Sequence, residues 1–178
     1  ITAKHIILAT EASKLVPQLE GKMNWRQTAT YYFSAPKSVI NNKVIALNYK
    51  SPRLVNNFCV ISDIAPGYAP SGKHLVSVSL TEIPDGTEED ISQAIKNDLS
   101  DSFGSTVQSW RLLRSYHITH ALPQIREMKE SVPISETKVR DGLYLAGDQM
   151  LNASINASLK SGQLAAQEAV LQYRTNGK

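Results

Sequence analysis

The chain has 178 residues, 42% of them hydrophobic and 20% charged, which is typical of a globular protein with a buried core. No apolar run approaches the roughly twenty residues that a membrane-spanning helix needs. The single cysteine, Cys59, excludes an internal disulfide framework and a cysteine-based metal cage, and we expect it to be a buried packing residue. The net charge is +3, but the basic residues are spread along the chain, which argues against nucleic-acid binding.

The first two thirds of the chain predict a β-rich region. Residues 4–10 indicate a strand buried on both faces, and residues 11–15 a short helix that stops before Pro17. Further strands are expected where aromatic and β-branched residues gather or alternate with small polar ones, over 28–33, 44–49, 58–62 and 75–80. Together they favour a largely antiparallel sheet. Residues 63–73 carry two prolines and two glycines and indicate a turn-rich loop.

A helix is predicted from Thr87, where a capping-box spacing precedes an acidic first turn, to Gly104. Its apolar face should pack on the sheet through Ile91, Ala94, Ile95, Leu99 and Phe103. Residues 107–119 then predict a long extended segment. The polar residues 124–138 indicate a returning loop.

The C-terminal region predicts a short buried strand, a turn and a helix. Leu143 to Ala146 form an apolar run of strand length. Gly147 permits a sharp turn or a close approach to a ligand, and Asp148 supplies an acceptor where the strand ends. Asn152 or Ser154 can cap the helix, whose free N–H groups favour an anion. Its packed face is expected to contain Ile155, Leu159, Gly162, Ala166 and Val170.

This strand–turn–helix resembles the C-terminal flavin-binding segment of the FAD-dependent amine oxidoreductases, which include amine oxidases, protoporphyrinogen oxidase and phytoene desaturases. The resemblance rests on the run from Gly142 to Asp148, on Ser154-Ile155 and on residues 161–166, with Ala157 where the family usually has glycine. It implies that Asp148 holds a ribityl hydroxyl of FAD beside Gly147. It also implies that the helix start lies against the pyrimidine edge of the flavin, through Ser154, Ile155 and Asn156.

Other positions are assigned by the same resemblance. The first strand ends in Ala-Thr, which implies that Thr10 lies near FAD. The loop around Tyr68 resembles a branch close to the phytoene desaturases, where it leads into the floor of the substrate site. The run that contains Tyr116 and His120 resembles a strand that lines the substrate cavity. For these three side chains a purely structural role is the alternative: a ring packed on its loop, a strand position, or a surface histidine.

The predicted fold class is α+β: a substrate-binding domain with an antiparallel or mixed sheet and packed helices, plus a strand and helix of a Rossmann-like FAD domain. We expect the end of a crossover strand in residues 1–16, the substrate-binding domain in 17–138 and the FAD-binding strand–turn–helix in 139–178. None of the nine glycines forms the Gly-x-Gly-x-x-Gly loop that cradles a pyrophosphate. The chain is therefore expected to be the C-terminal part of a larger enzyme and inactive alone.

The resemblance implies hydride transfer from a substrate C–H bond to FAD, of the desaturase or oxidase type. The expected substrate is a hydrophobic or amine-type small molecule, and the expected location is cytoplasmic. The sequence shows neither a metal-ligand pattern nor an acid–base or nucleophile constellation, as suits an enzyme whose reactive atom belongs to its cofactor. The alternative is a non-catalytic α+β module that binds a ligand on its sheet.

Overall fold

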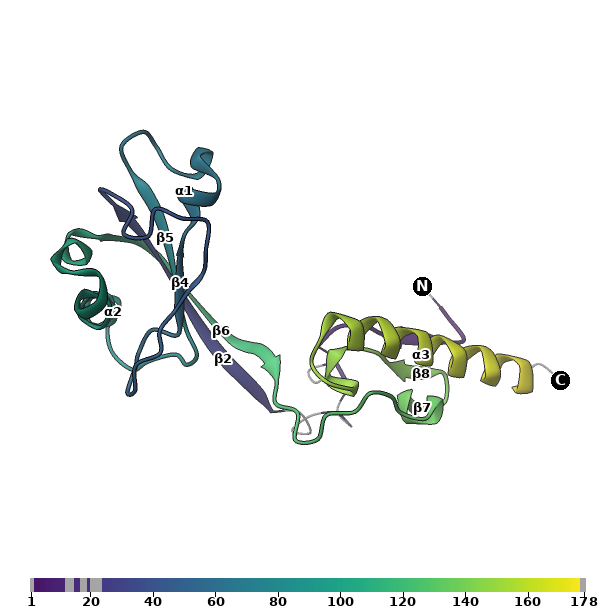
Figure 1. Cartoon of the computed structure of the whole chain (residues 1–178). Coiled ribbons are helices and arrows are strands. Elements are labelled where there is room, and N and C mark those ends of the chain that lie inside the picture. The colour runs from purple at the N-terminus through teal and green to yellow at the C-terminus, as the bar shows by residue number, and fades with distance from the viewer. Residues whose placement is uncertain (1, 12–14, 17–18, 20–23, 177–178) are drawn as a thin grey trace. The chain divides into compact units, whose positions relative to one another are not determined.

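The computed structural model describes residues 2–11, 15, 16, 19 and 24–176, and it divides into two compact units. Unit 1 contains residues 1–25 and 122–178, and unit 2 contains residues 26–121 (Figure 1). Residues 122–138 thus group with the C-terminal strand and helix, because Val132 packs against Leu151 and Ala157. The helix expected over 11–15 includes residues 12–14 and falls outside the described residues.

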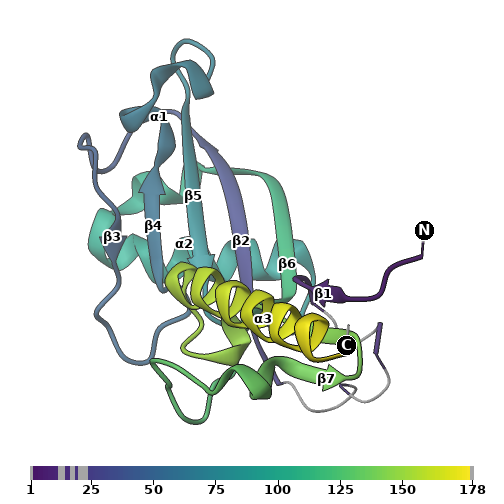
Figure 2. The ribbon, with the colours of Figure 1, turned by 90° about the vertical axis from the view of Figure 1, so that its right-hand side faces the viewer.

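Unit 2 is built on a five-stranded sheet, and Figure 2 shows its strands side by side with helix α2 behind them. In spatial order the strands are β3 (Ala46–Leu47), β4 (Asn57–Val60), β5 (His74–Leu80), β2 (Trp25–Ala35) and β6 (Arg111–Pro123). The pairs β3–β4, β4–β5 and β2–β5 are antiparallel, with Tyr31 opposite Val78 and Phe33 opposite Val76. The predicted antiparallel sheet is confirmed.

One face of this sheet is covered by α2 (Glu88–Phe103). Ile91, Ile95 and Leu99 of the helix are buried against the strands, whereas Ala94, expected on this face, is exposed. The capping box is confirmed, since Thr87 and Asp90 hydrogen-bond reciprocally, and Gly104 ends the helix. The core comprises Ala29, Tyr31, Phe33, Ala35, Val55, Phe58, Val60, Val76, Val78, Leu80, Ile91, Ile95, Leu99, Val107 and Trp110.

Three predicted strands differ from the observed elements. Only Ala46–Leu47 of the expected strand 44–49 pairs in the sheet. The strand expected over 58–62 ends at Val60, because the chain turns into α1 (Ile61–Ile64), where the Ser62 hydroxyl accepts a hydrogen bond from the N–H of Leu75. The segment expected to be extended from residue 107 begins as a 3-10 turn, η3 (Ser105–Ser109), in which Trp110 N–H bonds Val107 C=O.

Two smaller features of unit 2 are the loop over 63–73 and the environment of Cys59. The loop over 63–73 contains the 3-10 turn η2 (Pro66–Tyr68) and a glycine, Gly72, with positive φ. Cys59 is half-buried rather than buried, because its side chain projects from the other face of β4 than the core side chains of Phe58 and Val60. Burial raises the pKa of its thiol.

Unit 1 contains a three-stranded sheet in the order β1 (Ile6–Leu8), β8 (Leu143–Leu145) and β7 (Lys138–Arg140). Strands β1 and β8 are parallel, although 134 residues separate them, and β7 is antiparallel to β8. The loop before β7 ends in η4 (Ile134–Thr137). After β8 come η5 (Asp148–Met150) and the long helix α3 (Ile155–Asn176).

The expected packing face of α3 is wrong. Ile155 is 82% exposed and Leu159 70% exposed, and Val170 is also exposed. On the face that packs instead, Ala165 lies against Tyr144 and Ala146 of the sheet. Ala157 lies against Val132 and Leu151. The buried members of this face are Ala157, Ser161, Ala165 and Glu168.

Strand β1 also departs from prediction, since Ile6 and Ile7 are exposed rather than buried on both faces. Among the described residues, no helix is both long and apolar enough to cross a lipid bilayer.

Candidate functional site

The candidate site lies at the carboxyl ends of the parallel strands β1 and β8. Ala146 N–H bonds Leu8 C=O at 2.9 Å, so both strands end at the same edge of the sheet. Thr10 follows β1 there, and Gly147 and Asp148 follow β8. In sheets of parallel strands this edge is where ligands bind. Thr10 is exposed at this edge.

Gly147 forms the turn that leaves β8. Its φ of 155° lies in the region that favours glycine, and a Cβ here would collide with the side-chain amide of Gln149. The Gly147 N–H donates to the Ser161 hydroxyl at 2.9 Å, so this N–H is already satisfied within the chain. Gly147 therefore shapes the turn, and its own N–H is not directed to a ligand.

Asp148 opens η5 directly after this turn. Its backbone carbonyl accepts hydrogen bonds from the N–H groups of Leu151 and Ala153. Its carboxylate is half-exposed and has neither a hydrogen bond nor an ion pair with any residue that the structure describes. It is thus an available acceptor at the sheet edge.

The start of α3 follows within a few residues. Ser154 is the cap, since its hydroxyl accepts from the N–H of Ala157 at 3.1 Å, and Asn152 supports it by accepting from that hydroxyl at 2.6 Å. The first helical N–H groups, those of Ile155 and Asn156, have no acceptor within the described ranges, as is usual at a helix N-terminus. The site therefore combines one carboxylate acceptor with free donors at the positive end of a helix.

Unit 2 carries the three remaining predicted site residues. Tyr116 on β6 is exposed and meets the ring of Tyr32 edge-on, with ring centres 5.9 Å apart. The Arg114 guanidinium lies 5.2 Å from the centre of the Tyr116 ring. His120 is exposed near the end of β6, and its Nδ1 lies 3.2 Å from the Thr119 hydroxyl. Tyr68, at the end of η2, is 70% exposed.

Sequence reasoning missed Tyr32 and Arg114 as neighbours of Tyr116. The two-residue period of a strand places Arg114 beside Tyr116 and was available from the sequence, whereas Tyr32 depends on strand order. His117 projects differently from Tyr116: its Nε2 lies 3.0 Å from the hydroxyl of the buried Tyr31. Burial, and then the nearby Glu88 carboxylate, raise the pKa of Tyr31.

The chain matches one protein family by sequence and several solved structures by fold. The sequence model of this family, the flavin-containing amine oxidoreductases, matches residues 1–170. No curated protein matches the chain.

Three solved structures share the fold. An oxidoreductase from Methanosarcina mazei is 18% identical with a TM-score of 0.56, and 90% of this chain covers 38% of that one. Reduced UDP-galactopyranose mutase is 10% identical with a TM-score of 0.61, over 99% of this chain and 42% of that one. A putrescine oxidase with redesigned cofactor binding is 8% identical with a TM-score of 0.62, over 96% and 43%. The chain thus spans less than half the length of each of these proteins.

Proposed function

The chain belongs to the family of flavin-containing amine oxidoreductases, and from this we propose that it is the C-terminal part of an FAD-dependent oxidoreductase. The proposed reaction is hydride transfer from a substrate C–H bond to the flavin. The observation that carries the proposal is that the Asp148 carboxylate and the N–H groups of Ile155 and Asn156 have no partner among the described residues.

These groups suit the two chemistries that FAD presents. Asp148 would accept a hydrogen bond from a ribityl hydroxyl. The helix start would hold the pyrimidine edge of the flavin, where the amides of Ile155 and Asn156 and the helix dipole stabilise negative charge. When bound, FAD supplies the hydride acceptor, and the protein supplies binding and orientation. Ser154 keeps the helix start in place by capping it.

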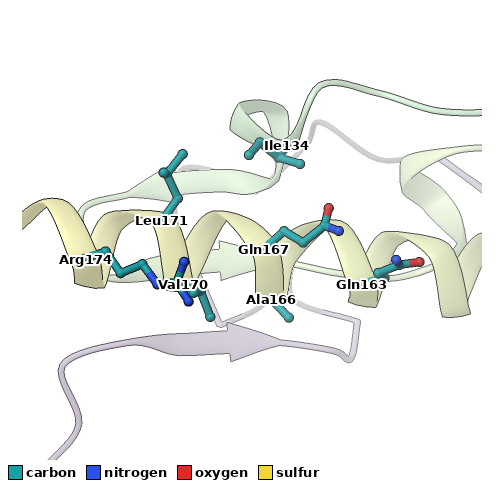
Figure 3. A pocket seen from close by; sticks show the side chains of 7 residues that line it. All are labelled: Ile134, Gln163, Ala166, Gln167, Val170, Leu171 and Arg174. Atoms are coloured by element: carbon teal, nitrogen blue, oxygen red, sulfur yellow. The ribbon is translucent and has the colours of Figure 1, made fainter.

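FAD binding by this enzyme is proposed to require an N-terminal dinucleotide-binding half, without which residues 1–178 are inactive. The fraction of its structural relatives that the chain covers supports this. So does the edge position of β1, whose exposed Ile6 and Ile7 are unusual for a parallel strand. An open apolar groove of about 540 Å³ along α3 is a further uncovered surface (Figure 3). It is lined by Ile134, Gln163, Ala166, Gln167, Val170, Leu171 and Arg174.

The substrate is proposed to meet unit 2. Tyr116, with Tyr32 and Arg114 against it, offers an exposed aromatic surface with an adjacent cation. His120 and Tyr68 are proposed to face substrate as well, and the substrate is an amine-type or hydrophobic small molecule. These residues are proposed to bind and orient the substrate, whose hydride the flavin would accept.

The test is cofactor retention by the complete protein that contains these residues. We expect the purified protein to show the absorption of oxidised flavin, and Asp148→Asn to lower the bound fraction. Asp141→Asn is the matched control, because this exposed carboxylate lies before β8 and pairs with Lys138 at 2.8 Å. A complete protein that is colourless and takes up no added FAD would refute the proposal and favour a non-catalytic module.

A further inference from the structure

Residues 43–50, which include β3, turn their apolar side chains outward. Ile45 is 65% exposed, Leu47 76% and Tyr49 90%, and Val44 is also exposed. Single exposed apolar residues are common, but four large ones among six consecutive positions are unusual. We call residues 43–50 the apolar segment.

A polar anchor explains this orientation. The Asn48 side-chain amide donates to Asp98 Oδ2 of α2 at 3.1 Å, and Asn48 N–H donates to Asn56 C=O at 2.9 Å. The same Asp98 oxygen accepts from the N–H groups of Leu54 and Val55, at 3.2 and 2.9 Å. Because Asn48 turns inward, extended backbone directs its neighbours Leu47 and Tyr49 outward.

The apolar side chains are displayed although space exists beneath them. A cavity of about 90 Å³ lies between this segment and α2, lined by Leu47, Asn48 and Tyr49 on one side and by Leu99 and Phe103 on the other. Leu47 and Tyr49 border this cavity but remain largely exposed to solvent.

Most of the basic side chains here form no ion pair with a described residue, whereas the neighbouring acidic side chains have partners. Residues 36–62 contain Lys37, Lys43, Lys50 and Arg53. Asp101 of α2 pairs with Lys50 at 3.0 Å, and Asp98 is held by its hydrogen bonds. Asp63 accepts from the Ser38 hydroxyl at 2.6 Å. Lys37 and Lys43 form no ion pair within the described part of the chain.

We propose that the apolar segment docks unit 2 on the surface of an anionic lipid bilayer. Ile45 and Leu47 would enter the boundary between headgroups and acyl chains, and Tyr49 would sit at headgroup level, where its amphipathic ring is suited. Lys37, Lys43 and Arg53 would meet the negative headgroups, with lysine stems lying along the apolar surface. This inference is independent of the proposed flavin chemistry.

The experiment is co-sedimentation of the complete protein that contains these residues with vesicles of phosphatidylcholine alone and of phosphatidylcholine mixed with phosphatidylglycerol. We expect binding to the mixed vesicles that weakens with added salt. The double variant Ile45→Ser, Leu47→Ser should bind at least about tenfold more weakly, since it removes the inserted side chains. Lys43→Glu should reduce binding to the mixed vesicles only.

The control is Leu113→Ser, which changes an exposed apolar residue of the same unit on β6 and should leave vesicle binding unaltered. Circular dichroism of each variant checks that the fold is kept. Equal binding by the double variant and the control would overturn the proposal, as would absence of binding to the mixed vesicles. Concentration-dependent dimers that the double variant abolishes, without vesicle binding, would instead assign the segment to a second copy of the chain.

Discussion

The hydroxyl of Ser161, on α3, is hydrogen-bonded to both backbone groups of Gly147, at the turn after β8. Gly147 N–H donates to Ser161 Oγ at 2.9 Å, and Ser161 Oγ lies 2.9 Å from Gly147 C=O. The hydroxyl has one proton, which it shares between Gly147 C=O and the helical carbonyl of Ser158, 3.0 Å away. Through this fully buried side chain, the helix fixes the turn that presents Asp148.

Ser161→Ala should therefore destabilise unit 1 by about 0.5–1.5 kcal/mol, because it leaves the half-buried N–H of Gly147 without its acceptor. The midpoint of urea unfolding measures the loss, and hydrogen exchange at Gly147 should accelerate. Ser158→Ala is the control, since that hydroxyl is exposed and makes only a 3.4 Å contact with Ser154 C=O. Equal stability of the two variants would contradict this account of the turn.

Gly142→Ala should separate β1 from β8. Gly142 has a φ of 72°, and a Cβ on it would lie 2.6 Å from the backbone oxygen of Lys4, which cannot move without disturbing β1. The strain and the displaced strand together should cost about 2–3 kcal/mol. Gly162→Ala, where a Cβ meets nothing within 4 Å, should instead stabilise α3 by roughly 0.5–1 kcal/mol. Thermal unfolding of both variants tests the pair, and a stable Gly142→Ala protein would refute it.

The capping box of α2 should make stability depend on acid pH. Hydrogen bonds from the Thr87 hydroxyl and then from its N–H lower the pKa of Asp90. A lowered pKa means that the stabilisation is complete above the ordinary Asp value of about 3.9 and is lost as pH falls through the lowered pKa.

Asp90→Asn should thus be less stable than the parent at neutral pH, with the difference shrinking below pH about 4. Melting temperatures measured across this range provide the check. Glu89→Gln is the control, because it changes the same charge in the first turn without disturbing the capping box. A difference between Asp90→Asn and the parent that stays constant with pH would exclude this mechanism.

Alkaline pH should destabilise unit 1 through Tyr144. Burial chiefly raises the pKa of this phenol, whose oxygen lies 3.0 Å from Nδ1 of His5. Its contribution to stability is complete below the ordinary tyrosine value of about 10 and is lost as pH rises through the raised pKa. Tyr144→Phe should lose less stability between neutral and alkaline pH than the parent, whereas Tyr49→Phe, at a solvent-exposed ring, should behave as the parent does. Identical alkaline profiles for Tyr144→Phe and the parent would refute this.

Features fixed by neighbours in the chain could be predicted from the sequence. The capping box at Thr87 and Asp90, the alternation of β5 and the strand–turn–helix around Gly147 all depend on residues a few positions apart. Their signals are local propensity, two-residue alternation and backbone freedom. The same local patterns carried the resemblance that led to the family.

Features that depend on distant partners could not be predicted. The strand over 44–49 shortened because Asn48 is held by Asp98, fifty positions away. The segment expected to be extended from residue 107 is a 3-10 turn up to Ser109, and Val107 and Trp110 are buried in the core of unit 2. The hydrogen bond between Gly147 and Ser161 forms only because α3 packs against β8, which the sequence does not show.

The sequence by itself determined where α2, β5 and the strand–turn–helix around Gly147 lie. The tertiary structure alone decided which face α3 buries and where the strands expected over 44–49 and from residue 107 begin and end. Periodicity selected the large apolar stripe of α3, with Ile155 and Leu159, as the packed face. Close approach of the helix to the sheet instead selected small side chains, because Ala165 packs against Tyr144 and Ala146 and the Ser161 hydroxyl reaches Gly147.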